Sequence, residues 1–334
     1  MALGWAVRSP ARRHGHSRRA RRDDPLRHTG EVSSVVPSDV LRAATGSDVA
    51  LQVVEEPIHG SSGAATAEVV RLTETVVTHG QKRPFSVIHK TVRPLSTGRH
   101  AEMATRPDHW AYWRREPLAY AAAVLPTGPG FRAPRCFGVH HDTAYLEDVA
   151  GGREDPRRAA EGLCRWQATS RVPSVDWLAA HQLEQRIAVT HLDWTTVDAD
   201  PRAVAMWEAR DRLLDELAVL PRVLSHGDYS LGNLIAADDG DTVALDWGTL
   251  GAAPAGADLA HLALSSLTDP LPAYLAASLD GPSPDDVSLG YRTTLVLTGS
   301  SRLHWMLSNS VPVPAGYVDF LQEHRPPVLR PEHL

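Results

Sequence analysis

The pattern of apolar and polar positions divides the chain into two parts of different character. Between residues 50 and 92, three short segments (LQVVEEPI, AEVVRLTETVV and PFSVIHKTV) are rich in β-branched residues and are separated by Gly, Ser and Pro. Such segments are typical of strands, and their close spacing predicts an antiparallel meander. Two further apolar runs, CFGVH and TAYLEDV, precede Gly151 and Gly152, which predict a hinge between two lobes.

Beyond these glycines the apolar positions follow a helical period. Helical spacing is found in four segments, residues 157–170, 201–219, 256–267 and 315–324. Earlier in the chain, residues 110–125 also predict a helix, in which Pro117 is tolerated only within the first turn. The segments VLSHG and TVALDWG are strand candidates between the helices. We therefore expect an α+β fold, with a strand-rich N-lobe in residues 31–150 and a helix-rich C-lobe in residues 151–334.

The composition is that of a globular protein large enough for two lobes. The chain has 334 residues, of which 43% are apolar and 22% are charged. Residues 1–30 differ, because they contain eight Arg and two Asp without hydrophobic periodicity, which predicts a disordered basic arm. Paired arginines also occur in twin-arginine export signals, but no apolar segment follows them here. No apolar run approaches the roughly 20 residues that cross a bilayer, so we expect a cytoplasmic protein without a membrane partner.

The charge is distributed unevenly, and this narrows the choice of partners. Residues 151–334 contain 14 Arg, no Lys and 25 acidic residues. Nucleic acids require a basic surface, so this half of the chain argues against them. The excess of acid suits a cationic small substrate, although an acidic surface that only maintains solubility explains it equally well. Cys136 and Cys164 are 28 residues apart, a spacing that indicates neither a disulfide framework nor a zinc site.

The strongest chemical signal is the segment HGDYSLGN, followed after nine residues by VALDWG. Phosphoryl transfer needs a carboxylate beside the attacking hydroxyl and oxygen ligands that hold Mg²⁺ on the phosphates. Asp228 precedes Asn233 by five residues, and Asp246 follows at the end of a predicted strand. Each residue alone suits an ordinary turn or strand end, but together they predict Asp228 as the catalytic base and Asn233 and Asp246 as magnesium ligands.

These two segments resemble the aminoglycoside phosphotransferase family, relatives of protein kinases, over roughly residues 50–325. The resemblance implies a protein-kinase-like two-lobed fold, ATP or GTP as phosphate donor, and Mg²⁺ as cofactor. It also implies an acceptor site between the catalytic loop and the C-lobe helices. The phosphate-anchoring lysine of the family corresponds to Lys90, one of only two lysines in the chain. Its carboxylate partner corresponds to Glu116, with Glu102 as the alternative, because an ion pair holds the ammonium over the phosphates.

Two nucleotide-binding segments follow from the same resemblance. The phosphate-covering turn corresponds to Gly60, Ser61, Ser62 and Gly63, although the full glycine motif is absent and an ordinary hairpin turn explains these residues as well. In the segment YLEDV, the carbonyl of Glu147 and the amide of Val149 correspond to the main-chain groups that contact adenine.

Two further residues near the motifs have structural explanations. His226 is expected to brace the catalytic loop through hydrogen bonds rather than to act in catalysis. Asp258, in GADLAHL, is expected to cap the amino end of its own helix.

The sequence therefore predicts an O-phosphotransferase that acts on a hydroxyl of a small molecule. An aminoglycoside-like molecule or another antibiotic is the favoured acceptor, with antibiotic resistance as the role, and the acidic C-lobe favours an acceptor with an amine. A primary-metabolite kinase for an amino alcohol or a sugar is the alternative. A protein kinase is disfavoured because HGD and DWG replace HRD and DFG. A non-catalytic nucleotide-binding module is disfavoured because the base, the Asn and the metal Asp are all present.

Overall fold

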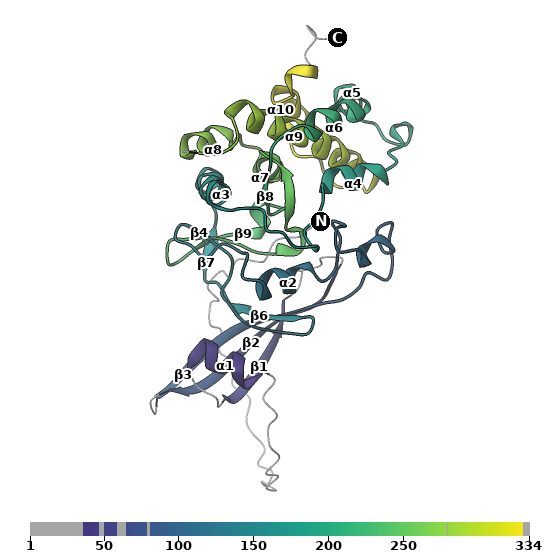
Figure 1. Cartoon of the computed structure of the whole chain (residues 1–334). Helices are drawn as coiled ribbons and strands as arrows, with labels where there is room; N and C mark the ends of the chain where they lie inside the picture. The colour runs from purple at the N-terminus through teal and green to yellow at the C-terminus, as the bar shows by residue number, and fades with distance from the viewer. Residues whose placement is uncertain (1–35, 47–49, 59–64, 79–80, 279, 330–334) are drawn as a thin grey trace, which may run out of the picture.

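The computed structural model has two lobes, a sheet lobe and a helical lobe (Figure 1). The predicted arm in residues 1–30 and the predicted turn Gly60–Gly63 lie outside the residues that the structure describes. The described residues are 36–46, 50–58, 65–78, 81–278 and 280–329. Within them, every helix is too short or too polar to cross a membrane. The predicted α+β class, with strands first and helices second, is confirmed.

The N-lobe is built on a five-stranded sheet in the order β1-β2-β3-β6-β5, and all neighbouring strands are antiparallel. Its strands are β1 (Ala50–Pro57), β2 (Thr66–Thr78), β3 (Gln81–Val92), β5 (Cys136–His140) and β6 (Thr143–Glu147). The first three strands form the predicted meander. Because successive residues point to opposite faces, Val70 and Leu72 lie buried on one face while Val69 lies buried on the other.

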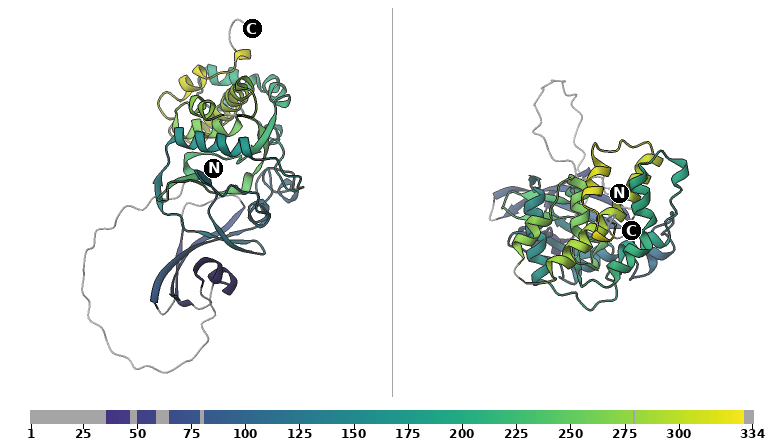
Figure 2. Two further views of the ribbon diagram at one scale, coloured as in Figure 1. Left: turned by 60° about the vertical axis from the view of Figure 1, so that its left-hand side comes forward. Right: turned by 90° about the horizontal axis from the view of Figure 1, so that it is seen from above.

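Each face of this sheet has its own cover. Helix α1 (Ser38–Thr45) buries Val40 and Leu41 against the first face (Figure 2). On the second face, Ile88 packs with Tyr120 of helix α2 (Arg115–Ala121). This second face is the one that turns toward the helical lobe, so residues of β3 on that side are available to a site between the lobes.

Helix α2 begins later and ends earlier than predicted, although Pro117 does lie in its first turn. Residues 110–114 form turns because the fully buried guanidinium of Arg115 binds carbonyl oxygens before the helix. It donates to the carbonyls of Pro107 (2.8 Å), His109 (2.7 Å) and Trp110 (2.8 Å). The same side chain also donates to the carbonyls of Trp177 and Gly248 in the C-lobe, so it ties this segment to both lobes.

The C-lobe contains two small sheets. One sheet contains β10 (Thr242–Ala244), β9 (Leu234–Ala237) and β7 (Gly151–Arg153), and its edge strand β4 (Phe131–Arg132) comes from residues that precede the link and were predicted to belong to the N-lobe. The other sheet contains β11 (Gly251–Pro254) and β8 (Arg222–Ser225). A Cβ at Gly151 would lie 2.2 Å from the carbonyl oxygen of Ala236, so this glycine permits the close approach of β7 to β9. The link between the lobes is residues 148–150, directly before the glycines predicted as the hinge.

The C-lobe contains every predicted helix, one of them divided in two, and three helices that were not predicted: Gln182–Ala188, Leu271–Ala277 and Pro284–Ser308. They are α3 (Pro156–Thr169), α4 (Gln182–Ala188), α5 (Pro201–Glu208), α6 (Arg210–Ala218), α7 (Ala257–Ser266), α8 (Leu271–Ala277), α9 (Pro284–Ser308) and α10 (Tyr317–Glu323). Residues 201–219 form two helices instead of one. The 25-residue helix α9 was not predicted, because it contacts α5, α6, α7, α8 and α10 and therefore lacks a single apolar face.

Short 3₁₀ turns complete the described fold. They are Met103–Thr105, Trp194–Thr196, Leu231–Asn233, Trp247–Thr249 and Pro327–Leu329. Two of them adjoin the motif residues: Leu231–Asn233 ends at the Asn of HGDYSLGN, and Trp247–Thr249 begins directly after Asp246. Both turns therefore place candidate metal ligands at the junction between irregular backbone and a turn.

Candidate active site

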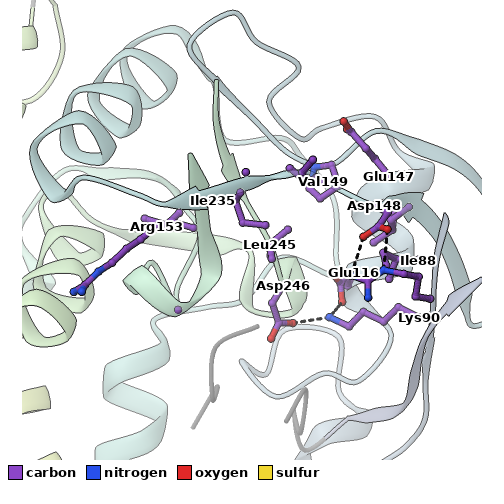
Figure 3. A pocket seen from close by; sticks show the side chains of 18 of the residues that line it. Ile88, Lys90, Glu116, Glu147, Asp148, Val149, Arg153, Ile235, Leu245 and Asp246 are labelled. Carbon is purple, nitrogen blue, oxygen red and sulfur yellow. Dashed lines mark hydrogen bonds and ion pairs between the residues drawn. The ribbon is translucent and has the colours of Figure 1, made fainter. Parts of the chain in front are cut away.

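A cavity of about 490 Å³ lies between the lobes (Figure 3). Both lobes and the link between them contribute to its wall. Among the lining residues are Ile88, Lys90, Glu116 and Leu146 of the N-lobe, Asp148 and Val149 of the link, and Leu234, Leu245 and Asp246 of the C-lobe. Apolar side chains thus face charged ones, an arrangement suited to a ligand with a flat apolar part and an ionic part.

Lys90 lies at the ionic end of the cavity between two carboxylates. Its Nζ is 2.5 Å from Oε2 of Glu116 and 2.8 Å from Oδ1 of Asp246 (Figure 3). Lys90 and Glu116 are almost fully buried, whereas the side chain of Asp246 is 32% exposed. Glu116, and not the alternative Glu102, is therefore the partner of Lys90.

The protonation of these three groups follows from burial and from their mutual contacts. Burial would lower the pKa of Lys90, but the carboxylates of Asp246 and Glu116 outweigh it and raise the pKa above its usual value. The Lys90 ammonium lowers the pKa of Asp246, while burial raises the pKa of Glu116. Lys90 thus retains its positive charge, and the carboxylate of Asp246 remains ionised.

Asp246 has an unusual backbone conformation. Its φ is +61° and its ψ is +66°, in the left-handed region that non-glycine residues seldom adopt. The neighbouring Trp247 is fully buried, and its amide donates to Oε1 of Glu116 at 3.4 Å. Surrounding contacts therefore hold Asp246 in a strained conformation that directs its carboxylate to Lys90, as is frequent at functional sites.

The catalytic-loop residues Asp228 and Asn233 lie together. Nδ2 of Asn233 donates to the carbonyl oxygen of Asp228 at 2.9 Å and to its carboxylate at 3.2 Å. Because the amide nitrogen is used in these contacts, the amide oxygen of Asn233 remains for a cation. One amide oxygen and the Asp246 carboxylate fit Mg²⁺, which takes few protein ligands and completes its shell with phosphate and water oxygens.

The loop that carries Asp228 is held by hydrogen bonds from two buried side chains, His226 and Asp258. His226 accepts from the amide of Asp228 at 3.2 Å through Nδ1, so Nε2 bears the proton and donates to the carbonyl of Leu245 at 2.8 Å. The predicted bracing role of His226 is confirmed. Gly227 has φ +81°, and a Cβ there would lie 2.5 Å from the carbonyl oxygen of Thr249, so only glycine fits.

Asp258 is the second buried brace, and its predicted role was wrong. Helix α7 begins at Ala257, so Asp258 lies inside its first turn and does not cap it. Its carboxylate instead accepts from the amides of His226 and Gly227, both at 2.9 Å, and from Oγ of Ser225 at 2.8 Å. The free amides that it satisfies belong to the catalytic loop, which packs over this helix.

Substitution Asp258→Asn should destabilise the loop. The amide group of Asn has one acceptor oxygen and would place N–H donors against the loop amides. We expect a loss of about 2 kcal/mol or more in the free energy of unfolding, because charge-assisted bonds to buried donors are lost. Asp285→Asn, in the exposed first turn of α9, is the matched control. Equal thermal denaturation of the two variants would contradict this role.

His261, one turn further along α7, faces Asp228. Its Nδ1 lies 3.7 Å from Oδ1 of Asp228 and has no hydrogen-bond partner among the described residues. Burial lowers the pKa of His261 to about 4, so the imidazole is neutral at physiological pH. The sequence analysis missed this residue, although its spacing of three from Asp258 places both on one helix face toward the loop.

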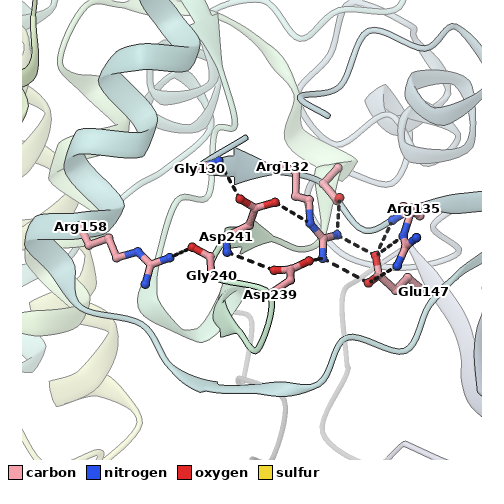
Figure 4. Close-up of polar contacts among 9 residues, drawn as sticks. Gly130, Arg132, Arg135, Glu147, Arg158, Asp239, Gly240 and Asp241 are labelled. Atoms are coloured by element: carbon pink, nitrogen blue, oxygen red, sulfur yellow. Dashed lines mark hydrogen bonds and ion pairs between the residues drawn. The ribbon is translucent and has the colours of Figure 1, made fainter. Parts of the chain in front are cut away.

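The side chain of Glu147 forms ion pairs with neighbouring arginines. Its carboxylate binds the guanidinium of Arg132 at 2.7 Å, and Arg132 also binds Asp239 and Asp241 of the C-lobe hairpin (Figure 4). Arg135 adds a further ion pair to Glu147. This network connects the link between the lobes to the β9–β10 hairpin and leaves the main chain of Glu147 and Val149 beside the cavity.

A second network, which the sequence analysis missed, binds Asp148 of the link. Arg71 of β2 binds the carboxylate of Asp148 through Nε at 2.8 Å and through a second guanidinium nitrogen at 3.1 Å. Ser86 of β3 donates to the same carboxylate at 2.5 Å. Bidentate arginine contacts of this kind are geometrically specific, so the link is fixed to the N-lobe sheet.

Comparison with known families identifies the family of this chain. The sequence model of the phosphotransferase enzyme family matches residues 103–290, more than half of the chain. The chain belongs to this family. The predicted resemblance to the aminoglycoside phosphotransferases is thereby confirmed, and the protein is a phosphotransferase that acts on an alcohol group of a small molecule. Family membership also implies a nucleotide as the phosphate donor. The matched residues include Glu116, the catalytic loop and Asp246, but not Lys90.

The chain is similar to several solved structures. A choline/ethanolamine kinase family protein from Mesorhizobium loti is 16% identical, with a TM-score of 0.47 over 85% of this chain and 90% of its own. A choline kinase from Streptococcus pneumoniae is 13% identical, with a TM-score of 0.45 over 86% and 96% of the two chains. A macrolide 2′-phosphotransferase from Brachybacterium faecium is 15% identical, with a TM-score of 0.45 over 83% and 92%. A search of curated proteins found no match.

Most of the predicted site residues lie close to one another in the structure. The predicted two-lobed arrangement, with a strand-rich first lobe and a helix-rich second lobe, is confirmed. The structure brings Lys90, Glu116 and Asp246 into one cluster, places Asn233 against Asp228, and sets Glu147 and Val149 in the cavity wall. Gly60, Ser61, Ser62 and Gly63 lie outside the described residues, so their role stays a prediction.

Proposed function

We propose that this chain transfers the γ-phosphate of ATP or GTP, with Mg²⁺, to a hydroxyl of a small molecule. The observation that carries this proposal is the position of Lys90 between Glu116 and Asp246 in the cavity, with the Asp228–Asn233 pair on the adjacent loop. A triphosphate there meets one ammonium, one available carboxylate and one amide oxygen. This set suits charge neutralisation of phosphates.

Each site residue has a separate role in the proposed in-line transfer. Lys90, fixed by Glu116, contacts the phosphates of the donor. Asn233 and Asp246 hold Mg²⁺, which when bound offsets the charge of the β- and γ-phosphates. The carboxylate of Asp228, oriented by Asn233, aligns the acceptor hydroxyl and takes its proton. Positioning and electrostatics supply most of the rate enhancement in such a site.

The nucleoside occupies the apolar part of the cavity in this proposal. Ile88, Leu146 and Leu245 enclose the flat base, while the carbonyl of Glu147 and the amide of Val149 bind its polar edge. The networks of Arg132 and Arg71 hold this main chain from both sides. Residues 31–150 thus form the nucleotide-binding lobe, and residues 151–334 supply the catalytic loop and the acceptor site.

For the acceptor, the motifs favour an aminoglycoside-like molecule or another antibiotic, and a resistance role. A primary metabolite such as an amino alcohol or a sugar is the alternative. Nucleoside-triphosphate turnover against a panel of hydroxylated antibiotics and metabolites, with Mg²⁺ and with a chelator, distinguishes them. Magnesium-dependent transfer to a panel member supports the proposal. Nucleotide binding that is indifferent to the chelator, without turnover, contradicts it and favours a non-catalytic nucleotide-binding module.

A further inference from the structure

Helix α7 is attached along one face to the catalytic loop. Near its amino end, the carboxylate of Asp258 accepts from two amides of that loop, both at 2.9 Å. Two turns later, Oγ of Ser265 accepts from the amide of Leu231 at 2.9 Å. Positions 258, 261 and 265 recur at helical spacing, so their side chains share this face. The outer two positions hold the loop at both ends, and His261 lies between them.

His261 faces the middle of the loop, where Asp228 lies. Its Nδ1 is 3.7 Å from Oδ1 of Asp228. Asn233 donates to the other carboxylate oxygen, Oδ2, at 3.2 Å. The two neighbours therefore approach different oxygens of the same carboxylate. Because each carboxylate oxygen can accept two hydrogen bonds, both contacts leave lone pairs for an acceptor hydroxyl.

The surroundings of His261 favour a proton on Nδ1. The residue is 7% exposed, and its Nδ1 has no hydrogen-bond partner among the residues that the structure describes. A neutral imidazole has one donor nitrogen and one acceptor nitrogen, whereas an ionised carboxylate only accepts. If the proton were on Nε2, the lone pair of Nδ1 would face a negative oxygen. With the proton on Nδ1, an N–H group faces that oxygen instead.

The ring of His261 is uncharged at physiological pH. Burial lowers its pKa to about 4, although the carboxylates of Asp228 and Asp258 raise it. The guanidinium groups of Arg302 and Arg186 lower it further. A cation beside a carboxylate reduces its affinity for a proton more than a neutral donor does. A neutral His261 can therefore orient the carboxylate of Asp228 and leave it able to accept a proton.

We propose that His261 is a positioning residue, whose Nδ1–H donates to Oδ1 of Asp228 and, with Asn233 on Oδ2, holds the carboxylate toward the acceptor hydroxyl. This inference rests on the proposed role of Asp228 as the base. The separation of 3.7 Å exceeds a hydrogen bond by roughly 0.5 Å, and a small rotation of the 32% exposed Asp228 side chain closes it. Hydrogen bonds at catalytic groups often tighten only when the substrate binds.

The tautomer of His261 provides the first test. NMR of the imidazole nitrogens in isotopically labelled protein shows which nitrogen carries the proton, and His261→Asn assigns the signal by its loss. We expect Nδ1–H for His261, in contrast to the Nε2–H of His226, and a shift toward Nε2–H in Asp228→Ala. An Nε2–H tautomer in the wild type, or an Nδ1–H tautomer that Asp228→Ala leaves unchanged, would overturn the proposal.

Kinetics of three variants provide the second test, with phosphate release from Mg²⁺-ATP and water as the acceptor. His261→Leu should lower kcat by about 10- to 100-fold, the effect of one hydrogen bond to a charged group, and leave the KM for nucleotide unchanged. His261→Asn carries an amide nitrogen on Cγ, where the imidazole carries Nδ1, and should retain most of the activity. His261→Gln carries its donor one bond farther out and should resemble His261→Leu.

The control is His324→Leu, which removes an equally buried imidazole directly after α10. It should leave kcat unchanged even where it lowers the melting temperature. An Asn variant no more active than the Leu variant, or a parallel loss of kcat and nucleotide affinity, would assign His261 to the structure alone and overturn the proposal. Failure of the proposed function is seen separately, as absence of magnesium-dependent nucleotide binding in the wild type, and the tautomer is measured without turnover.

Discussion

Asp228→Asn and Asp228→Ala should each lower kcat by about 100- to 10,000-fold, the usual contribution of a positioned general base. Asn keeps the shape and can still accept from Nδ2 of Asn233, so the loop geometry at 3.2 Å has a substitute partner. What it loses is the ability to take the proton of the acceptor hydroxyl. Nucleotide affinity should stay close to wild type, because Lys90 and Asp246 are untouched. Steady-state kinetics together with nucleotide titration measure both quantities.

The control for Asp228 is Asp238→Asn, an exposed carboxylate on the β9–β10 hairpin of the same lobe. It removes the same charge and should leave kcat and nucleotide affinity unchanged. Parallel loss of nucleotide binding and turnover in Asp228→Asn would show that the residue maintains the site as a whole. In that case the assignment of Asp228 as the base is wrong.

The sequence predicted those parts of the site that depend on local geometry. Asp228 and Asn233 are five residues apart on one loop, and Asp246 follows one short hairpin later, so spacing alone brings them near one another. The pairing of Lys90 with Asp246 spans 156 residues and was not predicted, because the family resemblance gave only Glu116 as the partner of Lys90. Likewise, the meander of β1, β2 and β3 follows from local strand signals.

The parts that were missed depend on contacts between distant segments. His261 of α7 faces Asp228, and no motif connects the two residues in the sequence. Asp258 was assigned to its own helix because capping is a local rule, whereas its partners are amides more than 30 residues away. Helix α9 was missed because a helix surrounded by other helices has no polar face to reveal its period.

Glu116→Gln distinguishes the effects of the two carboxylates that contact Lys90. This variant removes the charge that is 2.5 Å from Nζ but leaves Asp246 and Asn233 in place. We expect a lower kcat, because the ammonium is less firmly positioned, while nucleotide binding should still depend on Mg²⁺. The variant is therefore the comparison for substitution of the metal ligand itself.

Asp246→Ala should abolish magnesium-dependent nucleotide binding. We expect the affinity for Mg²⁺-ATP to fall by about 100-fold or more, to the level measured with a chelator. The loss of a residue that only hydrogen-bonds to a metal ligand already lowers metal affinity by about 10- to 100-fold, so the loss of a ligand itself should cost at least as much. The substitution removes the one carboxylate of the proposed metal site and leaves the phosphate charge to Lys90, whose remaining partner is Glu116. Titration of a fluorescent nucleotide with and without Mg²⁺ measures the effect, and thermal denaturation checks that the variant is folded. Because the Lys90 ammonium lowers the pKa of Asp246, the wild-type carboxylate stays ionised to a pH below its usual range, and magnesium dependence should be lost only as the pH falls through that depressed pKa. An Asp246→Ala variant that retains full magnesium dependence would show that the cation binds elsewhere, and the proposed roles of Asn233 and Asp246 would then be wrong.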